Sequence, residues 1–321
     1  MGDRQAKPEY RILSLAGGGF LGLYTALLLE ALEARAGVPL GRRFDLLAGT
    51  SIGAILALAL AYEVPMSRMV ELFVGAGPAV FSKRPLPGGT VGRLIDLGRS
   101  VMGPKYGGAA LRAALEAELG ARTLAEAVHA VVVTAVDVET CRTKVFKTPH
   151  VPAAEGDGAC RAVDVAMASS AAPTYFPSVR VGERLYADGG LYAVAPDQVA
   201  LHEAEHFARV DAQRVRMLAL GTAAAGFRPA EGVHEDDGAV GWLVNGRLVM
   251  TLISAQQQHV EAMMEDRLGE RYLRLDAPWP ADGGLGIDVA TTQAVTLLKR
   301  LAGETMLRLA DDRLAPFIAA R

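Results

Sequence analysis

The segment FDLLAGTSIGAILALAL, from Phe44 to Leu60, is the most informative stretch of the chain for both fold and chemistry. A short apolar run enters the turn GTSIG at residues 49–53 and leaves it as an apolar helix. The turn fits the G-x-S-x-G nucleophile elbow, in which flanking glycines let strand and helix approach closely while the serine points outward. The N-terminal N–H groups of the following helix favour negative charge near this serine. We therefore predict that Ser51 is a nucleophile.

Short apolar runs alternate with helical segments along the chain. The predicted strands cover residues 11–16, 44–48, 129–139, 142–148, 184–187, 215–220 and 271–276. The predicted helices cover residues 21–35, 52–62, 67–74, 109–119, 163–170, 197–207, 240–264 and 289–309. This alternation indicates an α/β layered domain with a mostly parallel sheet. No composition break marks a second domain, so we expect one domain over residues 1–321, with elements at 239–310 packed on a catalytic core of about 10–225.

Composition and charge exclude several classes of protein. The longest apolar stretch, residues 52–61, is shorter than the ~20 residues that span a bilayer. Residues 1–10 are polar and lack the apolar region of a signal peptide, so we expect a cytoplasmic protein. The net charge of −3 is spread along the chain, which argues against a DNA or RNA partner. Cys141 and Cys160 lack C-x-x-C spacing and are expected to be free thiols.

A glycine-rich turn follows the first predicted strand. Gly17, Gly18 and Gly19 present N–H groups at the start of a helix, where an esterase needs preorganised donors for an oxyanion. With Gly22, the same turn also matches the G-x-G-x-x-G dinucleotide fingerprint. The acidic partner of that fingerprint is missing, since Asp45 stands at the start of the second strand and not at its end. We therefore favour the oxyanion hole.

Asp188 is the candidate base. It ends a short predicted strand and is followed by two glycines that leave its carboxylate accessible. A carboxylate that hydrogen-bonds a serine in a dry cleft can take the serine proton directly. The alternative is an ordinary turn aspartate ahead of two glycines.

The segment HEAEH at residues 202–206 matches H-E-x-x-H. Histidines four apart share a helix face and could hold zinc, with Glu203 as base and Glu231 or His234 as further ligands. No metzincin continuation follows His206, so we favour a solvated polar helix face and expect no metal or cofactor.

A Ser–Asp–His triad of the α/β-hydrolase type is a further alternative. Its imidazole would come from one of the histidines at 202, 206, 234 and 259. That fold places several strands before the elbow, whereas only one or two precede Ser51. The position of the elbow along the chain disfavours this alternative.

Glycines and prolines recur from Gly75 to Gly108, with PLPGG at 85–89 and GPKYGG at 103–108. The pattern is typical of a mobile lid or membrane-facing loop, or of a connector with short helices. Five basic residues of this segment could meet phosphates of a lipid or nucleotide, or form a solvated surface: Lys83, Arg84, Arg93, Arg99 and Lys105.

Four motifs in order resemble the patatin-like phospholipase family: GGGFLG at 17–22, GTSIGA at 49–54, ASSAAPTYFP at 168–177 and DGG at 188–190. The resemblance implies a three-layer α/β/α fold and metal-free hydrolysis of lipid acyl esters. It also implies a dyad of Ser51 and Asp188 beside an oxyanion hole of Gly17, Gly18 and Gly19. Two residues depart from the family's D-G-G-G-x-R-G, because Ala16 and Leu21 replace the aspartate and the arginine. A patatin-like binding module without catalysis is therefore the alternative.

Residues 188–205 and 254–276 resemble the patatin-like effectors of bacterial anti-phage signalling systems. Val194-Ala195-Pro196 stands where the family often has Asn-x-Pro. This resemblance implies activation by a cyclic oligonucleotide and degradation of membrane phospholipid at the periphery of the inner membrane. The unliganded protein should then be a poor enzyme, since an effector acts only through its differential affinity for two states. A homo-oligomer is compatible with the sequence but is not specified by it.

Overall fold

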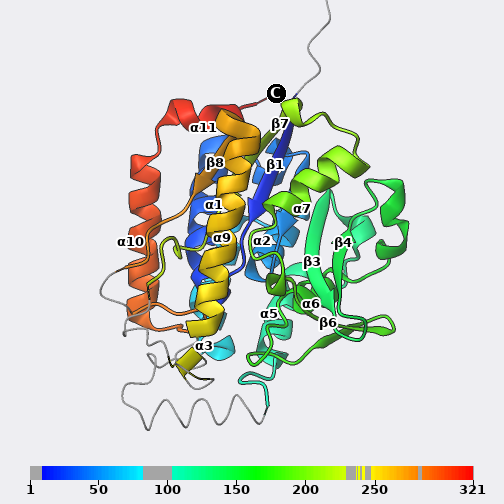
Figure 1. The fold of residues 1–321 in the computed structure, drawn as a ribbon, viewed down its shortest axis with the longest axis vertical. Coiled ribbons are helices and arrows are strands. Elements are labelled where there is room, and N and C mark those ends of the chain that lie inside the picture. The colour runs from blue at the N-terminus through cyan, green and yellow to red at the C-terminus, as the bar shows by residue number, and fades with distance from the viewer. Residues whose placement is uncertain are drawn as a thin grey trace, which may run out of the picture.

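The computed structural model describes residues 9–81, 103–228, 236, 238, 241–242, 247–280 and 284–320. Within these ranges the strands form one eight-stranded sheet of order β5-β6-β3-β2-β1-β7-β8, with β4 paired to β3 (Figure 1). The strands are β1 Tyr10–Leu15, β2 Leu46–Gly49, β3 Val131–Asp137, β4 Arg142–Lys147, β5 Val179–Val181, β6 Arg184–Asp188, β7 Val215–Leu220 and β8 Tyr272–Leu275. Strands β3, β2, β1, β7 and β8 pair in parallel, whereas β4 and β6 run antiparallel to β3.

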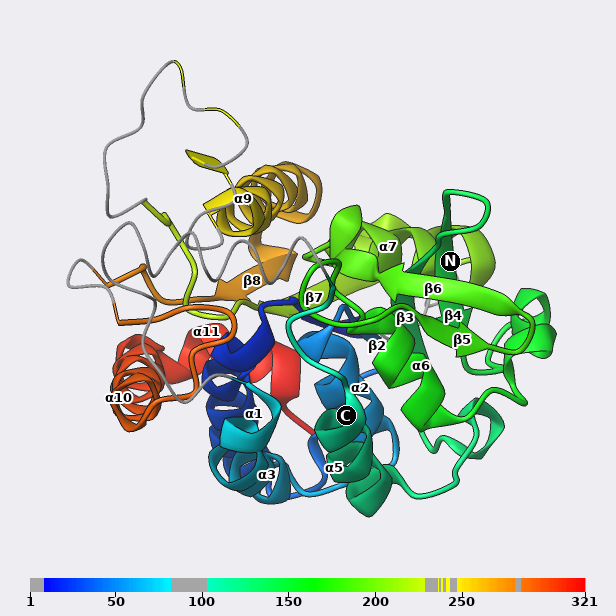
Figure 2. The same cartoon turned by 90° about the horizontal axis from the view of Figure 1, so that it is seen from below.

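Helices cover both faces of this sheet, so the predicted three-layer α/β/α fold is confirmed. The helices are α1 Gly22–Ala36, α2 Ile52–Ala61, α3 Met66–Val80, α5 Ala109–Leu119, α6 Ala162–Ser169, α7 Asp197–His202, α9 Arg247–Leu268, α10 Thr292–Arg308 and α11 Asp311–Ile318. Figure 2 shows α7 and α9 on one face of the sheet and α1, α2, α3, α5 and α6 on the other. The C-terminal helices α9 and α10 pack on α7 and α1, respectively.

Side chains of the central strands alternate between two hydrophobic clusters, one on each face. Leu13 and Leu47 belong to the cluster beneath α1 and α2, whereas Ile12 and Leu46 belong to the cluster beneath α7 and α9. Every residue of α2 is buried, which explains why this helix is apolar all round. Parallel strands covered by helices on both faces need such continuous apolar runs.

Helix α3 extends beyond its predicted end at residue 74. It continues to Val80, so the segment from Gly75, predicted as a loop or as a connector with short helices, begins with helix. The cause is packing: Gly77 lies against the ring of Phe20, where a Cβ would approach a ring carbon to 2.6 Å. Burial of this face overrides the low helix propensity of the two glycines.

Of the five basic residues that could contact phosphates in the 75–108 segment, the structure describes one. Four of its basic residues lie outside the described residues: Lys83, Arg84, Arg93 and Arg99. Lys105 is described, and its Nζ lies 2.9 Å from a carboxylate oxygen of Asp288. The hydroxyl of Tyr106 donates to the same carboxylate at 2.8 Å. Lys105 is therefore part of a partly buried ion pair with Asp288 and not of a fully solvated surface.

Several smaller elements differ from prediction. Strand β5 and helix α11 were not predicted, because a three-residue strand and a short helix containing Pro316 carry little periodicity. The helix predicted over 197–207 is α-helical only to His202 and continues as a π-helix over Glu203–Phe207. The two cysteines are free, as predicted.

Candidate active site

The elbow places Ser51 at the junction of β2 and α2. Ser51 has a φ of 55°, in the left-handed region that non-glycine residues rarely adopt. Helix α2 also approaches strand β1 so closely that a Cβ at Gly53 would collide with the backbone of Leu15. The backbone N–H of Ser51 donates to the hydroxyl of Ser169 at 2.8 Å. The strained turn is thus supported by both β1 and α6.

Buried hydroxyls connect this elbow to the loop that follows β6. The hydroxyl of Thr50 donates to the carbonyl of Ala193 at 2.6 Å and lies 2.7 Å from the hydroxyl of Thr134. Gly189 packs against the same Thr134, where a Cβ would overlap its side chain. The two turns that carry Ser51 and Asp188 are therefore joined by direct contacts.

Asp188 lies at the end of β6 with only 6% of its surface exposed. Its Oδ1 accepts a hydrogen bond from the N–H of Gly190 at 2.7 Å, and the hydroxyl of Ser51 lies near enough to lower the pKa of its carboxyl group. Burial raises the pKa of Asp188 to about 6, although the Gly190 N–H and the Ser51 hydroxyl act in the opposite direction. The structure thus brings together the two residues that the sequence predicted as nucleophile and base.

The glycine loop lies on the other side of Ser51. The N–H of Gly17 donates to the carbonyl of Val194 at 2.8 Å, so it is not available to a substrate. In the described part of the chain, no acceptor is recorded for the N–H groups of Gly18, Gly19 and Ile52. Of the three glycines predicted as oxyanion donors, Gly18 and Gly19 therefore remain candidates. Ile52, the residue after the candidate nucleophile, is a further candidate that the sequence analysis did not name, although the elbow motif assigns a donor to that position.

The candidate nucleophile, the candidate base and the glycine loop line one apolar cavity of about 260 Å³. The rest of its lining is mainly apolar and comes from several elements, including Ile55, Phe81, Leu111, Tyr175, Phe176, Leu191, Val249, Leu252, Ile253 and Ile287. A nucleophile beside a buried carboxylate in such a cavity suits a substrate with a long apolar part.

The two departures from the family pattern are both core positions. Leu21 is fully buried, and Ala16 donates its N–H to the carbonyl of Leu220 at 3.0 Å. The N–H of Phe20 donates to the carbonyl of Ile287 at 2.7 Å. Apolar packing and backbone hydrogen bonds therefore support the glycine loop without a charged pair at residues 16 and 21.

The H-E-x-x-H segment forms the predicted solvent-exposed face at its two histidines but not at Glu203. His202 and His206 are exposed and stack with ring centroids 5.0 Å apart, but Glu203 points inward and is only 2% exposed. Its carboxylate accepts from Lys147 at 2.5 Å and lies 3.3 Å from Nε2 of His150. The prediction was wrong for Glu203, because this residue begins a π-helix and its carboxylate turns inward to the buried Lys147. Among the described residues, no group of three or more histidine, cysteine, aspartate or glutamate side chains could hold a metal.

The structure also disfavours a catalytic histidine. His202, His206 and His259 are exposed, and the described residues that line the cavity include no histidine. His234 and Glu231 lie outside the described residues. Among the described residues that line the cavity, Asp188 is the one with a carboxylate.

The fold has three layers, and one apolar cavity is lined by a serine elbow, a glycine loop and a buried aspartate. This combination defines a class of lipid acyl hydrolases. The chain belongs to the patatin-like phospholipase family, whose model matches residues 13–201. The family and enzyme class predicted from the sequence are therefore confirmed.

Curated relatives place the chain more closely within this family. It is 37% identical over 317 residues to a cGAMP-activated phospholipase of Pseudomonas aeruginosa, covering 97% of this chain and 92% of that protein. It is 32% identical over 318 residues to a cGAMP-activated phospholipase of Vibrio cholerae, covering 91% and 88%. A cUMP-AMP-activated phospholipase of Escherichia coli is 43% identical over 97 residues, which cover 30% of this chain and 29% of that protein. The predicted resemblance to nucleotide-activated family members is thus confirmed as sequence similarity.

None of the helices in the described ranges has both the length and the apolar character needed to cross a membrane.

Proposed function

We propose that Ser51 and Asp188 form a catalytic dyad that hydrolyses acyl esters of phospholipids. The observation that carries this proposal is that Ser51 and the buried Asp188 line the wall of the same apolar cavity, beside the glycine loop. Asp188 takes the proton as Ser51 Oγ attacks the ester carbonyl, and the N–H groups of Gly18 and Gly19 stabilise the oxyanion. The proton passes to the leaving alcohol, which departs and leaves an acyl-enzyme. Asp188 then deprotonates a water molecule that attacks the acyl-enzyme, and the proton passes from Asp188 to Ser51 Oγ as the fatty acid is released.

The pKa of Asp188 gives this proposal a predicted pH dependence. Only the carboxylate can accept the serine proton, and burial raises its pKa to about 6. We expect kcat/KM for a short-chain nitrophenyl ester to rise with pH through about 6 and then level off by pH 8. An acidic limb near pH 4, or a flat profile between pH 5 and 8, would contradict Asp188 as the base.

We further propose that a cyclic oligonucleotide activates the enzyme. Two of the relatives are named for activation by cGAMP and a third for activation by cUMP-AMP, which supports an activator of this chemical class. In this proposal the protein is cytoplasmic, binds the periphery of the inner membrane when active and degrades phospholipid as part of antiviral defence. Differential affinity of the nucleotide for an active state would supply the switch.

Release of fatty acid from phospholipid vesicles tests both parts of the proposal. The wild type and Ser51→Ala are incubated with no nucleotide and with a panel of cyclic di- and trinucleotides. We expect release only by the wild type and only with one or a few nucleotides. Release without nucleotide would support the lipase and remove the switch. Equal release by Ser51→Ala would exclude the serine mechanism, and binding of a nucleotide without any release would favour a binding module.

A further inference from the structure

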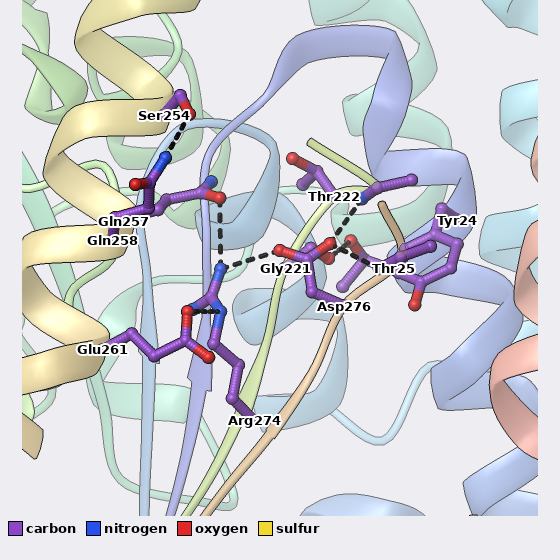
Figure 3. Close-up of polar contacts among 12 residues, drawn as sticks. Tyr24, Thr25, Gly221, Thr222, Ser254, Gln257, Gln258, Glu261, Arg274 and Asp276 are labelled. Carbon is purple, nitrogen blue, oxygen red and sulfur yellow. Dashed lines mark hydrogen bonds and ion pairs between the residues drawn. The ribbon is translucent and has the colours of Figure 1, made fainter. Parts of the chain in front are cut away.

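Three consecutive glutamines of α9 each contact a different neighbour. Gln258 is exposed and donates to the hydroxyl of Ser254 at 2.9 Å on the same helix. Gln257 is buried and accepts from Nη2 of Arg274 at 3.1 Å (Figure 3). Gln256 is half-buried and reaches the loop that follows Asp188. These contacts give Gln256 a role that the sequence did not indicate.

The side-chain amide of Gln256 joins two backbone groups of this loop. Its Oε1 accepts from the N–H of Val194 at 3.0 Å, and its Nε2 donates to the carbonyl of Gly190 at 3.1 Å. A side-chain amide has both a donor and an acceptor, so it can pair with one backbone carbonyl and one backbone N–H at the same time. One side chain therefore closes the loop between residues 190 and 194.

The same two loop residues hold the two halves of the active site. The N–H of Gly190 donates to Oδ1 of Asp188 at 2.7 Å, and the carbonyl of Val194 accepts from the N–H of Gly17 at 2.8 Å. A shift of the loop would therefore move the carboxylate of Asp188 and the start of the glycine loop together. Gln256 is 62 residues from Val194 and 66 residues from Gly190 in the sequence. Its two hydrogen bonds therefore connect α9 to a distant loop.

The helix that presents Gln256 is itself fixed to the sheet. The side chain of Arg274 on β8 is only 4% exposed and lies 2.9 Å from a carboxylate oxygen of Asp276 and 3.5 Å from one of Glu261 on α9. Figure 3 shows Gln257 and Glu261 of α9 directed toward this guanidinium. Removing one partner of a buried charged group is costly, so this network holds the middle of α9 in place.

We propose that Gln256 is a positioning residue for ester hydrolysis, acting through Gly190 on Asp188 and through Val194 on the glycine loop. The inference rests on the proposed dyad of Ser51 and Asp188. Because α9 also supplies Val249, Leu252 and Ile253 to the cavity wall, the helix that contacts the acyl chain also holds the reacting groups in place.

Gln256→Met tests this role, because methionine keeps the length of the side chain and the helix propensity but removes both hydrogen bonds. Gln258→Met is the matched control on the same helix. In the nucleotide-activated protein we expect kcat of Gln256→Met to fall on the order of 10- to 100-fold, as for misplaced catalytic groups, with KM nearly unchanged. The acidic limb of its pH profile should move upward, because the Gly190 hydrogen bond lowers the pKa of Asp188.

Amide hydrogen exchange provides a readout that does not depend on activity. We expect faster exchange at residues 189–194 in Gln256→Met than in the wild type or in Gln258→Met. Unchanged exchange at these residues would overturn the positioning role, as would faster exchange with wild-type kcat and pH profile. A wild type that hydrolyses no ester with any nucleotide would instead refute the proposed function, and exchange alone would then decide whether Gln256 holds the loop.

Discussion

Asp188→Asn should reduce the rate of ester hydrolysis on the order of 10³- to 10⁴-fold, because the amide cannot accept the proton of Ser51. The substitution keeps the shape of the side chain and the acceptor for the N–H of Gly190. Hydrolysis of a nitrophenyl ester and the rate at which a fluorophosphonate labels Ser51 should fall together, since both need an activated serine. Labelling at the wild-type rate would show that Asp188 does not activate Ser51.

Asp188→Asn should lower activity but raise the free energy of unfolding at neutral and higher pH. The pKa of Asp188 is raised from 3.8 to about 6, so its ionised form lowers the free energy of unfolding by about 3 kcal/mol above pH 6. This destabilisation disappears as the pH falls from about 6 toward 3.8, where the carboxyl is protonated in both states. Asp188→Asn should therefore be at least as stable as the wild type at pH 8, measured by denaturant unfolding, with a smaller difference at pH 4.

Asp137→Asn is the matched control for both effects. Asp137 lies on the neighbouring strand β3, where the ion pair with Arg184 lowers its pKa. It does not line the cavity. We expect this variant to keep wild-type hydrolysis and to be less stable at neutral pH. A loss of activity equal to that of Asp188→Asn would point to a general disturbance of the sheet edge.

Local motifs predicted the parts of the site whose geometry depends on nearby residues. The elbow at Ser51 and the turn after Asp188 need glycines at particular positions, because backbones approach there within the radius of a Cβ. Such requirements leave a trace in a few adjacent residues. The parallel sheet was predictable for a similar reason, since strands buried on both faces need continuous apolar runs.

Contacts between distant segments were not predictable in this way. The sequence does not show that the carbonyl of Val194 occupies the N–H of Gly17, or that Glu203 turns inward to Lys147. Gln256 looks like one of three equivalent polar residues on a helix until the fold brings the 190–194 loop beside it. In each case the partner is at least 56 residues away, so no local pattern specifies the contact.

Gly19→Ala should be the most damaging single change in the glycine loop. Gly19 has a φ of +57°, and an added Cβ would collide with the backbone carbonyl of Ile287, which is not the end of a flexible side chain and cannot turn away. The loop must shift, and the carbonyl of Ile287 is also the acceptor for the N–H of Phe20. Because loss of one oxyanion donor costs on the order of 10²- to 10³-fold in kcat, we expect at least this loss in vesicle and nitrophenyl ester assays.

Gly37→Ala separates backbone strain from damage to the loop. Gly37 has a φ of +66° at the end of α1, and nothing lies within 4 Å of the position of an added Cβ. Both variants pay the strain of a left-handed alanine, roughly 1–2 kcal/mol, but only Gly19→Ala displaces the proposed oxyanion donors. We therefore expect Gly37→Ala to unfold at a lower denaturant concentration and still hydrolyse ester at the wild-type rate. Hydrolysis by Gly19→Ala at that same rate would mean that the N–H groups of Gly18 and Gly19 do not stabilise the oxyanion, and the N–H of Ile52 would then be the donor to test.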